Sequence, residues 1–276
     1  MDYLVPDDLA AAIEMKAAGV SVLAGGTDIY PSHVGRPLPT SVLDLGGLHE
    51  LRGIAREDGT YRIGALTRWS EFADTALPPC FDGLRAAARH VGGVQVQNAG
   101  TVGGNLCNAS PAADGIPPLL SLDASVELTS TQGTRVLPLE GFLTGYRATA
   151  LRPDELLTAV LVPADREEAR TAFGKLGLRR YLVISVVMVA TAVEVGVEGL
   201  VTRSGVAVGA CSPVAQRLSS LEADLVDRPV DGLAEVVTRE HLASLSPIDD
   251  VRGTAAYRLE AALTLLRRSL SEVGSS

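Results

Sequence analysis

The chain has 276 residues, of which 46% are hydrophobic and 21% charged, values typical of a folded globular protein with room for two or three subdomains. A formal net charge of −9 and the lack of a basic patch argue against nucleic-acid binding, which depends on neutralising phosphates. The three cysteines and four histidines show no ligand spacing, which argues against a disulfide framework, a zinc ribbon or a cysteine-held cluster in this chain.

No targeting or membrane segment is predicted. The first residues, MDYLVPDDLAAAIEM, are acidic early and lack the basic and apolar regions of a secretory signal. The longest nearly apolar run, at 181–193, is shorter than the roughly 18 residues that span a bilayer, and its β-branched residues favour a buried strand. We therefore expect a cytoplasmic protein.

The first third of the chain mixes helices with short strands. Acidic residues in the first turn and a closing glycine predict a helix over 7–18, and an apolar run predicts a strand at 20–24. The stretch 39–67 alternates short apolar runs with turns, which predicts several strands. Helical patterns follow at 69–76 and 82–90.

The rest of the chain changes character near 165–170, a polar stretch that is the expected domain boundary. Before it we predict a polar loop at 101–114, a short helix at 115–124, two strands around a tight turn at 125–139 and a strand ending at Pro163. After it we predict long antiparallel strands from about 170 and helices from about 231.

Two glycine-rich segments carry the chemistry, LAGGTD at 23–28 and TVGGNLCNASPAAD at 101–114. Their glycine pairs let the backbone approach a ligand closely, and consecutive amide N–H groups in such turns can bind an anion. Together they could hold the two phosphates of a dinucleotide, although ordinary turns would look similar. The hydrogen-bonding side chains that could add to them are Thr27, Thr101, Asn105, Asn108 and Ser110.

The acidic residues of these segments need a different role, because a carboxylate repels phosphate. Asp28 and Asp114 could accept from a ribose hydroxyl or cap a helix, and Asp114 directly precedes the predicted helix at 115–124. The acidic pairs at 154–155 and 167–168 are expected to be solvated charges. No Rossmann, P-loop or nucleophile-elbow motif occurs, so the residues alone predict only a phosphate-rich cofactor held by two loops.

Four blocks, in order, resemble the FAD-binding medium subunit of the molybdenum hydroxylases, the xanthine dehydrogenase and carbon monoxide dehydrogenase family. They are LAGGTDIYP at 23–31, NAGTVGGNLCNASPAADGIPPLLSLDA at 98–124, FLTGYRATALRPDELLTAVLVP at 142–163 and AFGKLGLRRYLVISVV at 172–187. The resemblance implies an α+β fold: a PCMH-type FAD-binding region of two subdomains, 1–55 and 56–167, followed by a sheet-plus-helix domain over 168–276 of the carbon monoxide dehydrogenase flavoprotein C-terminal type.

The resemblance also implies an electron-transfer role. Substrate would be oxidised at a molybdopterin cofactor in a large subunit, and electrons would pass through [2Fe–2S] clusters of a small subunit to FAD in this chain. FAD would pass them to NAD⁺, oxygen or a quinone, within a dimer of heterotrimers. Two alternatives stay open: a self-contained FAD-dependent oxidase or dehydrogenase on a related fold, and a scaffold that has lost its flavin.

The site residues that the resemblance implies lie in its matching blocks, and no metal ligand is among them. They are Ala24, Gly25, Gly26, Thr27, Asp28, Thr101, Gly103, Gly104, Asn105, Asn108, Ser110, Asp114, Leu157 and Lys175. Leu157 would pack near the flavin or the adenine. Lys175 would approach the flavin ring and stabilise the charge of its reduced form, unless it is a salt-bridged strand lysine.

Three further features complete the comparison with the family. Many relatives carry a basic residue where this chain has Gln97, and an acidic residue near the position of Val183. The four-cysteine loop that some relatives insert is absent here. Cys107, in the middle of the second glycine-rich segment, is expected to be a small packed thiol.

Overall fold

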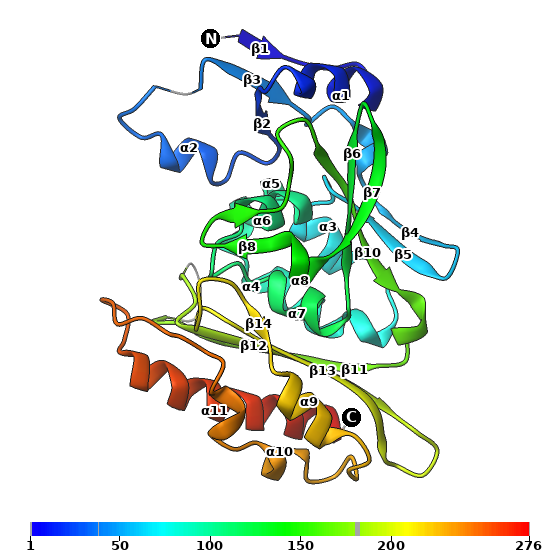
Figure 1. The fold of residues 1–276 in the computed structure, drawn as a ribbon, viewed down its shortest axis with the longest axis vertical. Helices are drawn as coiled ribbons and strands as arrows, with labels where there is room; N and C mark the ends of the chain where they lie inside the picture. The colour runs from blue at the N-terminus through cyan, green and yellow to red at the C-terminus, as the bar shows by residue number, and fades with distance from the viewer. Residues whose placement is uncertain (1, 38, 180–182, 276) are drawn as a thin grey trace.

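The computed structural model describes residues 2–37, 39–179 and 183–275. Three layers follow one another along the long axis of the molecule (Figure 1). We call them the N-terminal layer (2–51), the middle layer (52–169) and the C-terminal layer (170–275). Each layer has its own sheet, and the mixture of helices with mainly antiparallel strands confirms the predicted α+β class.

The N-terminal layer is a parallel three-stranded sheet in the order β1-β3-β2, and helix α1 connects β1 to β2 along the chain. The predicted first helix is confirmed, and Asp8 caps it by accepting a hydrogen bond from the Ala11 amide at 2.8 Å. The elements are β1 (Asp2–Leu4), α1 (Leu9–Ala17), β2 (Ser21–Leu23), α2 (Ile29–Ser32) and β3 (Ser41–Asp44), followed by a 3₁₀ turn at His49–Leu51.

The middle layer pairs an antiparallel five-stranded sheet, in the order β4-β5-β10-β6-β7, with a group of short helices. Its strands are β4 (Ile54–Glu57), β5 (Thr60–Gly64), β6 (Ser125–Ser130), β7 (Gly133–Pro138) and β10 (Leu156–Pro163), and β8 (Leu143–Gly145) pairs separately with β9 (Ala148–Thr149). Its helices are α3 (Trp69–Asp74), α4 (Asp82–His90), α5 (Val94–Ala99), α6 (Val102–Asn108), α7 (Ile116–Ser121) and α8 (Leu139–Phe142), with 3₁₀ turns at Pro79–Phe81 and Ala164–Arg166.

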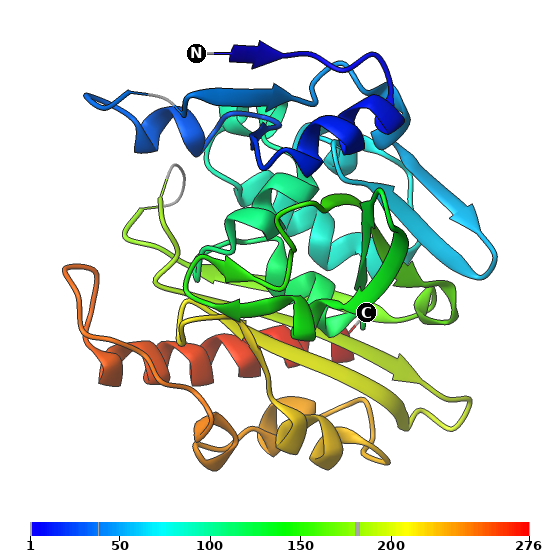
Figure 2. The same ribbon diagram turned by 45° about the horizontal axis from the view of Figure 1, so that its top comes forward.

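The C-terminal layer is an antiparallel sheet, in the order β11-β12-β13-β14, with three helices on its outer face (Figures 1 and 2). The elements are β11 (Arg170–Leu176), β12 (Val187–Val195), β13 (Val201–Gly209), β14 (Gln216–Arg217), α9 (Ser219–Leu225), α10 (Leu233–Val236) and α11 (Ala255–Gly274), with a 3₁₀ turn at Glu240–Leu242. The buried strand predicted within 181–193 is β12, and Tyr181 and Leu182 lie outside the described residues.

One prediction about local structure is wrong. The expected loop at 101–114 is helical over half of its length, since α6 runs from Val102 to Asn108. Val102 and Leu106, four residues apart, are both fully buried and fix this helix against the core. Thr101 caps it, its hydroxyl oxygen accepting from the Gly104 amide at 3.1 Å. Helices α2, α5 and α9 were also not predicted from the sequence.

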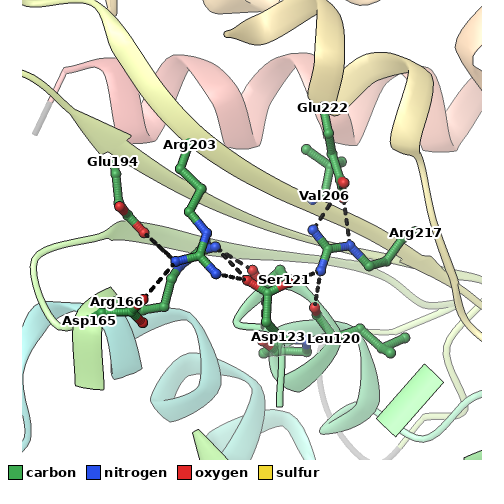
Figure 3. A network of polar contacts seen from close by, with 11 residues as sticks. Leu120, Ser121, Asp123, Asp165, Arg166, Glu194, Arg203, Val206, Arg217 and Glu222 are labelled. Atoms are coloured by element: carbon green, nitrogen blue, oxygen red, sulfur yellow. Dashed lines mark hydrogen bonds and ion pairs between the residues drawn. The ribbon is translucent and has the colours of Figure 1, made fainter. Parts of the chain in front are cut away.

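A network of charged side chains joins the middle layer to the C-terminal layer (Figure 3). Asp123, just after α7, accepts hydrogen bonds from Arg166, at 2.7 Å, from Arg203, at 2.6 Å, and from Arg217. Arg166 is fully buried, and its Nε also lies 2.7 Å from Glu194. Glu194 lies on β12, Arg203 on β13 and Arg217 on β14, so this cluster fixes the end of α7 against the C-terminal sheet.

Candidate functional site

A cleft with a volume of about 480 Å³ opens between the N-terminal and middle layers, within the size range of small-molecule sites. Both glycine-rich segments line it, together with apolar side chains of the middle layer such as Trp69 and Val91. The predicted site residues found in its wall are Ala24, Gly25, Gly26, Thr27, Asp28, Thr101, Gly103, Gly104, Asn105, Asn108 and Leu157. The fold therefore brings together two segments that lie some seventy residues apart in the sequence.

The first segment presents a turn of free backbone amides. Within the described part of the chain, no hydrogen bond is donated by the amides of Gly25, Gly26, Thr27 or Asp28. Gly26 has a φ of +68°, a conformation that glycine adopts without strain, and a Cβ on Gly25 would lie 2.0 Å from the carbonyl oxygen of Ala99. We call residues 25–28 the free-amide turn; successive unpaired N–H groups of this kind form an anion-binding concavity.

The second segment contributes differently from the prediction. The amides around its glycine pair are already used: Val102 donates to Thr67 O, Gly103 to Ala65 O and Gly104 to the Thr101 hydroxyl. Two turns of free amides at the glycine pairs were expected, but only the first pair has them, because helix formation and packing satisfy the amides of the second pair. A Cβ on Gly103 would lie 2.7 Å from the Cβ of Ala65, so this glycine allows α6 to approach the sheet.

Asn105 and Gly104, both on α6, leave room and hydrogen-bonding capacity for a ligand. The side-chain oxygen of Asn105 is buried and has no hydrogen-bond partner among the described residues. A buried polar atom without a partner is costly, so this carboxamide gains from a ligand that offers one. A Cβ on Gly104 would meet the Thr101 hydroxyl at 2.9 Å and then only the methyl of Ala24, at 4.0 Å, on the opposite wall.

A three-residue cluster joins the two glycine-rich segments beside the cleft. The guanidinium of Arg147 donates to both carboxylate oxygens of Asp28, at 3.0 Å each, and to Asn108 Oδ1 at 3.0 Å. Asn108 in turn donates to Asp28 at 3.3 Å. Arg147 was not among the predicted site residues, because it lies 119 positions from Asp28 in the chain.

The remaining predicted residues lie outside the cleft wall. Lys175 is buried on β11, where its ammonium lies 2.6 Å from Asp114 Oδ2 and donates to His90 O at 3.0 Å. Ser185 donates to the other oxygen of Asp114 at 2.6 Å. Asp114 does not cap the following helix, because the N-cap of α7 is Gly115 and no side chain serves it. Ser110 accepts from the Ala112 amide.

Two further expectations are corrected. Cys107 is not a packed thiol: its side chain is exposed and lines the cleft, whereas Cys80 and Cys211 are buried. Glu155, expected to be a solvated charge, is only 2% exposed and binds Arg135 through both carboxylate oxygens, at 2.6 and 2.9 Å. Burial opposes ionisation there, but the Arg135 hydrogen bonds outweigh it and lower the pKa of Glu155.

The two departures from the family pattern have local roles. Gln97, on α5, donates to the carbonyl oxygen of Arg89 at 2.9 Å and so anchors α5 to the end of α4. Val183 lies beside Gly177: a Cβ added to Gly177 would lie 2.5 Å from the Cγ1 of Val183.

Across the residues that the structure describes, neither a candidate metal site nor a helix long and apolar enough to cross a membrane is found.

Comparisons with known proteins agree with this architecture. Residues 1–165 match the model of the FAD binding domain in molybdopterin dehydrogenase, and residues 172–273 match the carbon monoxide dehydrogenase flavoprotein C-terminal domain. A xanthine dehydrogenase FAD-binding subunit of Escherichia coli O157:H7 is 31% identical over 96% of this chain and 92% of its own length. A 6-hydroxypseudooxynicotine dehydrogenase complex subunit alpha of Paenarthrobacter nicotinovorans is 29% identical over 98% and 93%.

Solved structures show the same fold. A chain of carbon monoxide dehydrogenase from Hydrogenophaga pseudoflava superposes with a TM-score of 0.89 at 26% identity, covering all of this chain and 97% of that one. A chain of the reconstituted enzyme from Oligotropha carboxidovorans gives 0.90 at 25% identity, covering 100% and 98%. The chain belongs to the FAD-binding medium-subunit family of the molybdenum hydroxylases, and it is an oxidoreductase subunit of the xanthine dehydrogenase and carbon monoxide dehydrogenase type.

Proposed function

We propose that this chain holds FAD in the cleft between its two glycine-rich segments and transfers electrons from the [2Fe–2S] clusters of a small subunit to NAD⁺ or another acceptor, such as oxygen or a quinone. The observation that carries the proposal is the free-amide turn, residues 25–28, which faces a cleft of suitable volume. Bound FAD would supply the redox chemistry, because its ring takes up and releases electrons.

The residues of the cleft fit the parts of a dinucleotide. The free-amide turn suits a diphosphate, because four successive residues whose N–H groups have no partner among the described residues line the cleft. The buried carboxamide of Asn105 can pair with a polar group of the ligand. Trp69, Val91 and Leu157 supply an apolar wall, which is the usual lining for planar rings.

The role of Lys175 remains a proposal. Its ammonium, 6% exposed, is held by Asp114 on the side of β11 that faces the middle layer. We propose that this fixed positive charge lies near the flavin ring and stabilises the charge of its reduced form. Asp114 and Ser185 then act by orienting Lys175, and a direct contact between Asp114 and the cofactor is not needed.

The partner subunits are proposed from the relatives. One relative is named as a subunit of a dehydrogenase complex, and a 26% identical protein of Hydrogenophaga pseudoflava is named a carbon monoxide dehydrogenase medium chain. We propose that this chain likewise joins a small iron–sulfur subunit and a large molybdopterin subunit, as a dimer of heterotrimers in the cytoplasm. The relatives' names also favour this role over a self-contained oxidase.

Co-expression with the neighbouring genes tests the proposal. The purified complex should show flavin absorbance together with iron and molybdenum, and NADH should bleach the flavin band if NAD⁺ is the acceptor. A chain that stays colourless when FAD is supplied contradicts the proposal. A chain that turns over a substrate with oxygen by itself, without partner subunits, supports the self-contained oxidase instead.

A further inference from the structure

We propose that Arg147 is a positioning residue for the cofactor: by binding Asp28 and Asn108 at once, it fixes the free-amide turn against α6 and neutralises the carboxylate beside it. This inference rests on the proposed binding of FAD in the cleft. It concerns a residue that does not line the cleft and that acts through Asp28.

The α2 segment, residues 24–37, depends on this cluster. None of its residues is buried, so packing holds it only weakly. Among the described residues, only Asp28 links the side chains or amides of this segment to another part of the chain by hydrogen bonds or ion pairs. Its carboxylate accepts from Asn108 and Arg147. The same Asp28 ends the free-amide turn, so the cluster acts on the turn directly.

The side of the cluster that belongs to the middle layer is rigid. Arg147 lies in the β8–β9 hairpin, where its backbone amide donates to Ala109 O at 3.1 Å. Both residues have left-handed backbones, with φ of +51° at Arg147 and +45° at Ala109, conformations that persist only where the surroundings require them. Asn108, the last residue of α6, is held on the same side.

The charge of the cluster matters as much as its geometry. Asp28 contributes a carboxylate to the cleft wall, and the phosphates of a dinucleotide would be repelled by it. Arg147 meets both of its oxygens in the two-pronged geometry that only arginine provides. Loss of this arginine would both release the α2 segment and leave a negative charge beside the phosphate position.

Titration of the full-length chain with FAD, followed by flavin fluorescence, tests this role. Arg147→Gln should raise the Kd for FAD about tenfold or more, since a charge-assisted pair is lost. The thermal unfolding midpoint should stay near that of the wild type, because exposed ion pairs contribute little to stability. Arg147→Lys should give an intermediate Kd. Arg56→Gln, which removes an exposed arginine paired with Glu167, is the matched control and should bind FAD normally.

A second substitution shows whether Arg147 acts through Asp28. In the double variant Asp28→Asn with Arg147→Gln, the unpaired negative charge is gone, so FAD should bind more tightly than to Arg147→Gln alone. Equal or weaker binding by the double variant contradicts the inference, as does an Arg147→Gln chain that binds FAD like the wild type. A wild-type chain that binds no FAD contradicts the proposed function itself, and the inference with it.

Discussion

Gly104→Val should weaken the binding of FAD by roughly 100-fold or more, which corresponds to about 2.8 kcal/mol. Gly104 lies in the first turn of α6, and a Cβ there points across the cleft toward Ala24. A valine side chain would occupy the gap between the two glycine-rich segments and press on the Thr101 hydroxyl that caps α6. The measurement is the Kd for FAD, from fluorescence titration of the purified chain.

The same substitution at another glycine separates this effect from damage to the fold. Gly47 is exposed, its backbone is outside the left-handed region, and a Cβ there would meet nothing within 4 Å. Gly47→Val should therefore bind FAD normally. Gly104→Ala, which adds only the Cβ, should lie between the wild type and Gly104→Val. Normal FAD binding by Gly104→Val would show that the cofactor does not pass between the two segments.

Asp123→Asn should lower the free energy of unfolding by about 3 kcal/mol, because it leaves the fully buried Arg166 and its neighbours Arg203 and Arg217 with too little negative charge. Asparagine tolerates the left-handed backbone of this residue, whose φ is +56°, so the substitution isolates the loss of charge. Asp123→Ala should cost about 1 kcal/mol more, since alanine is strained in this conformation. Urea unfolding at pH 7 measures both.

Asp58→Asn is the matched control for this substitution. Asp58 has a similar left-handed backbone, with φ of +47°, but its side chain is exposed. It does not pair with the arginines that bind Asp123. Its replacement should leave the free energy of unfolding within about 0.5 kcal/mol of the wild-type value. Equal stability of Asp123→Asn and Asp58→Asn would show that the charged network does not hold the layers together.

The contribution of Asp123 should also disappear in acid. Burial alone would raise the pKa of this carboxyl, but the hydrogen bond from Arg217 and the charges of the three arginines lower it below its ordinary value of 3.8. A carboxyl whose pKa is lowered by folding stabilises the folded state at pH values above its unfolded-state pKa. This stabilisation is lost as the pH falls below that value and through the folded-state pKa. The difference in stability between wild type and Asp123→Asn should therefore be constant from pH 7 to about 5 and shrink below about pH 4.

The sequence predicted those elements whose signals are local. The first helix followed from acidic residues expected in its first turn and from the glycine after it; the structure places Asp8 at the N-cap instead and Gly19 just beyond the end. The long strands of the C-terminal layer followed from continuous β-branched runs, which are typical of buried strands. The walls of the cleft followed from the glycine-rich segments, once their resemblance to a known family placed them side by side.

What the sequence did not show depends on contacts between distant residues. Helix α6 looks like a loop because glycine and asparagine are poor helix formers, and it is stabilised by the burial of Val102 and Leu106 together with the Thr101 cap. Arg147 and Asp28 are 119 positions apart, and no local pattern announces such a pair. The placement of Lys175 beside the flavin, which came from the resemblance alone, is still a prediction, as are the domain boundaries.

Labelling of Cys107 tests most directly whether FAD occupies the cleft. This cysteine is exposed and lines the cleft, whereas Cys80 and Cys211 are completely buried, so a thiol reagent applied to the folded chain should modify Cys107 alone. Desolvation within the cleft raises the pKa of its thiol to about 12, so the reaction is slow at neutral pH and is followed over a long time course. The rate of its modification by N-ethylmaleimide, read by mass spectrometry, should fall as FAD is added, along the same binding curve as the flavin fluorescence. A rate that does not change when FAD is bound would contradict the central claim that the cofactor lies between the two glycine-rich segments.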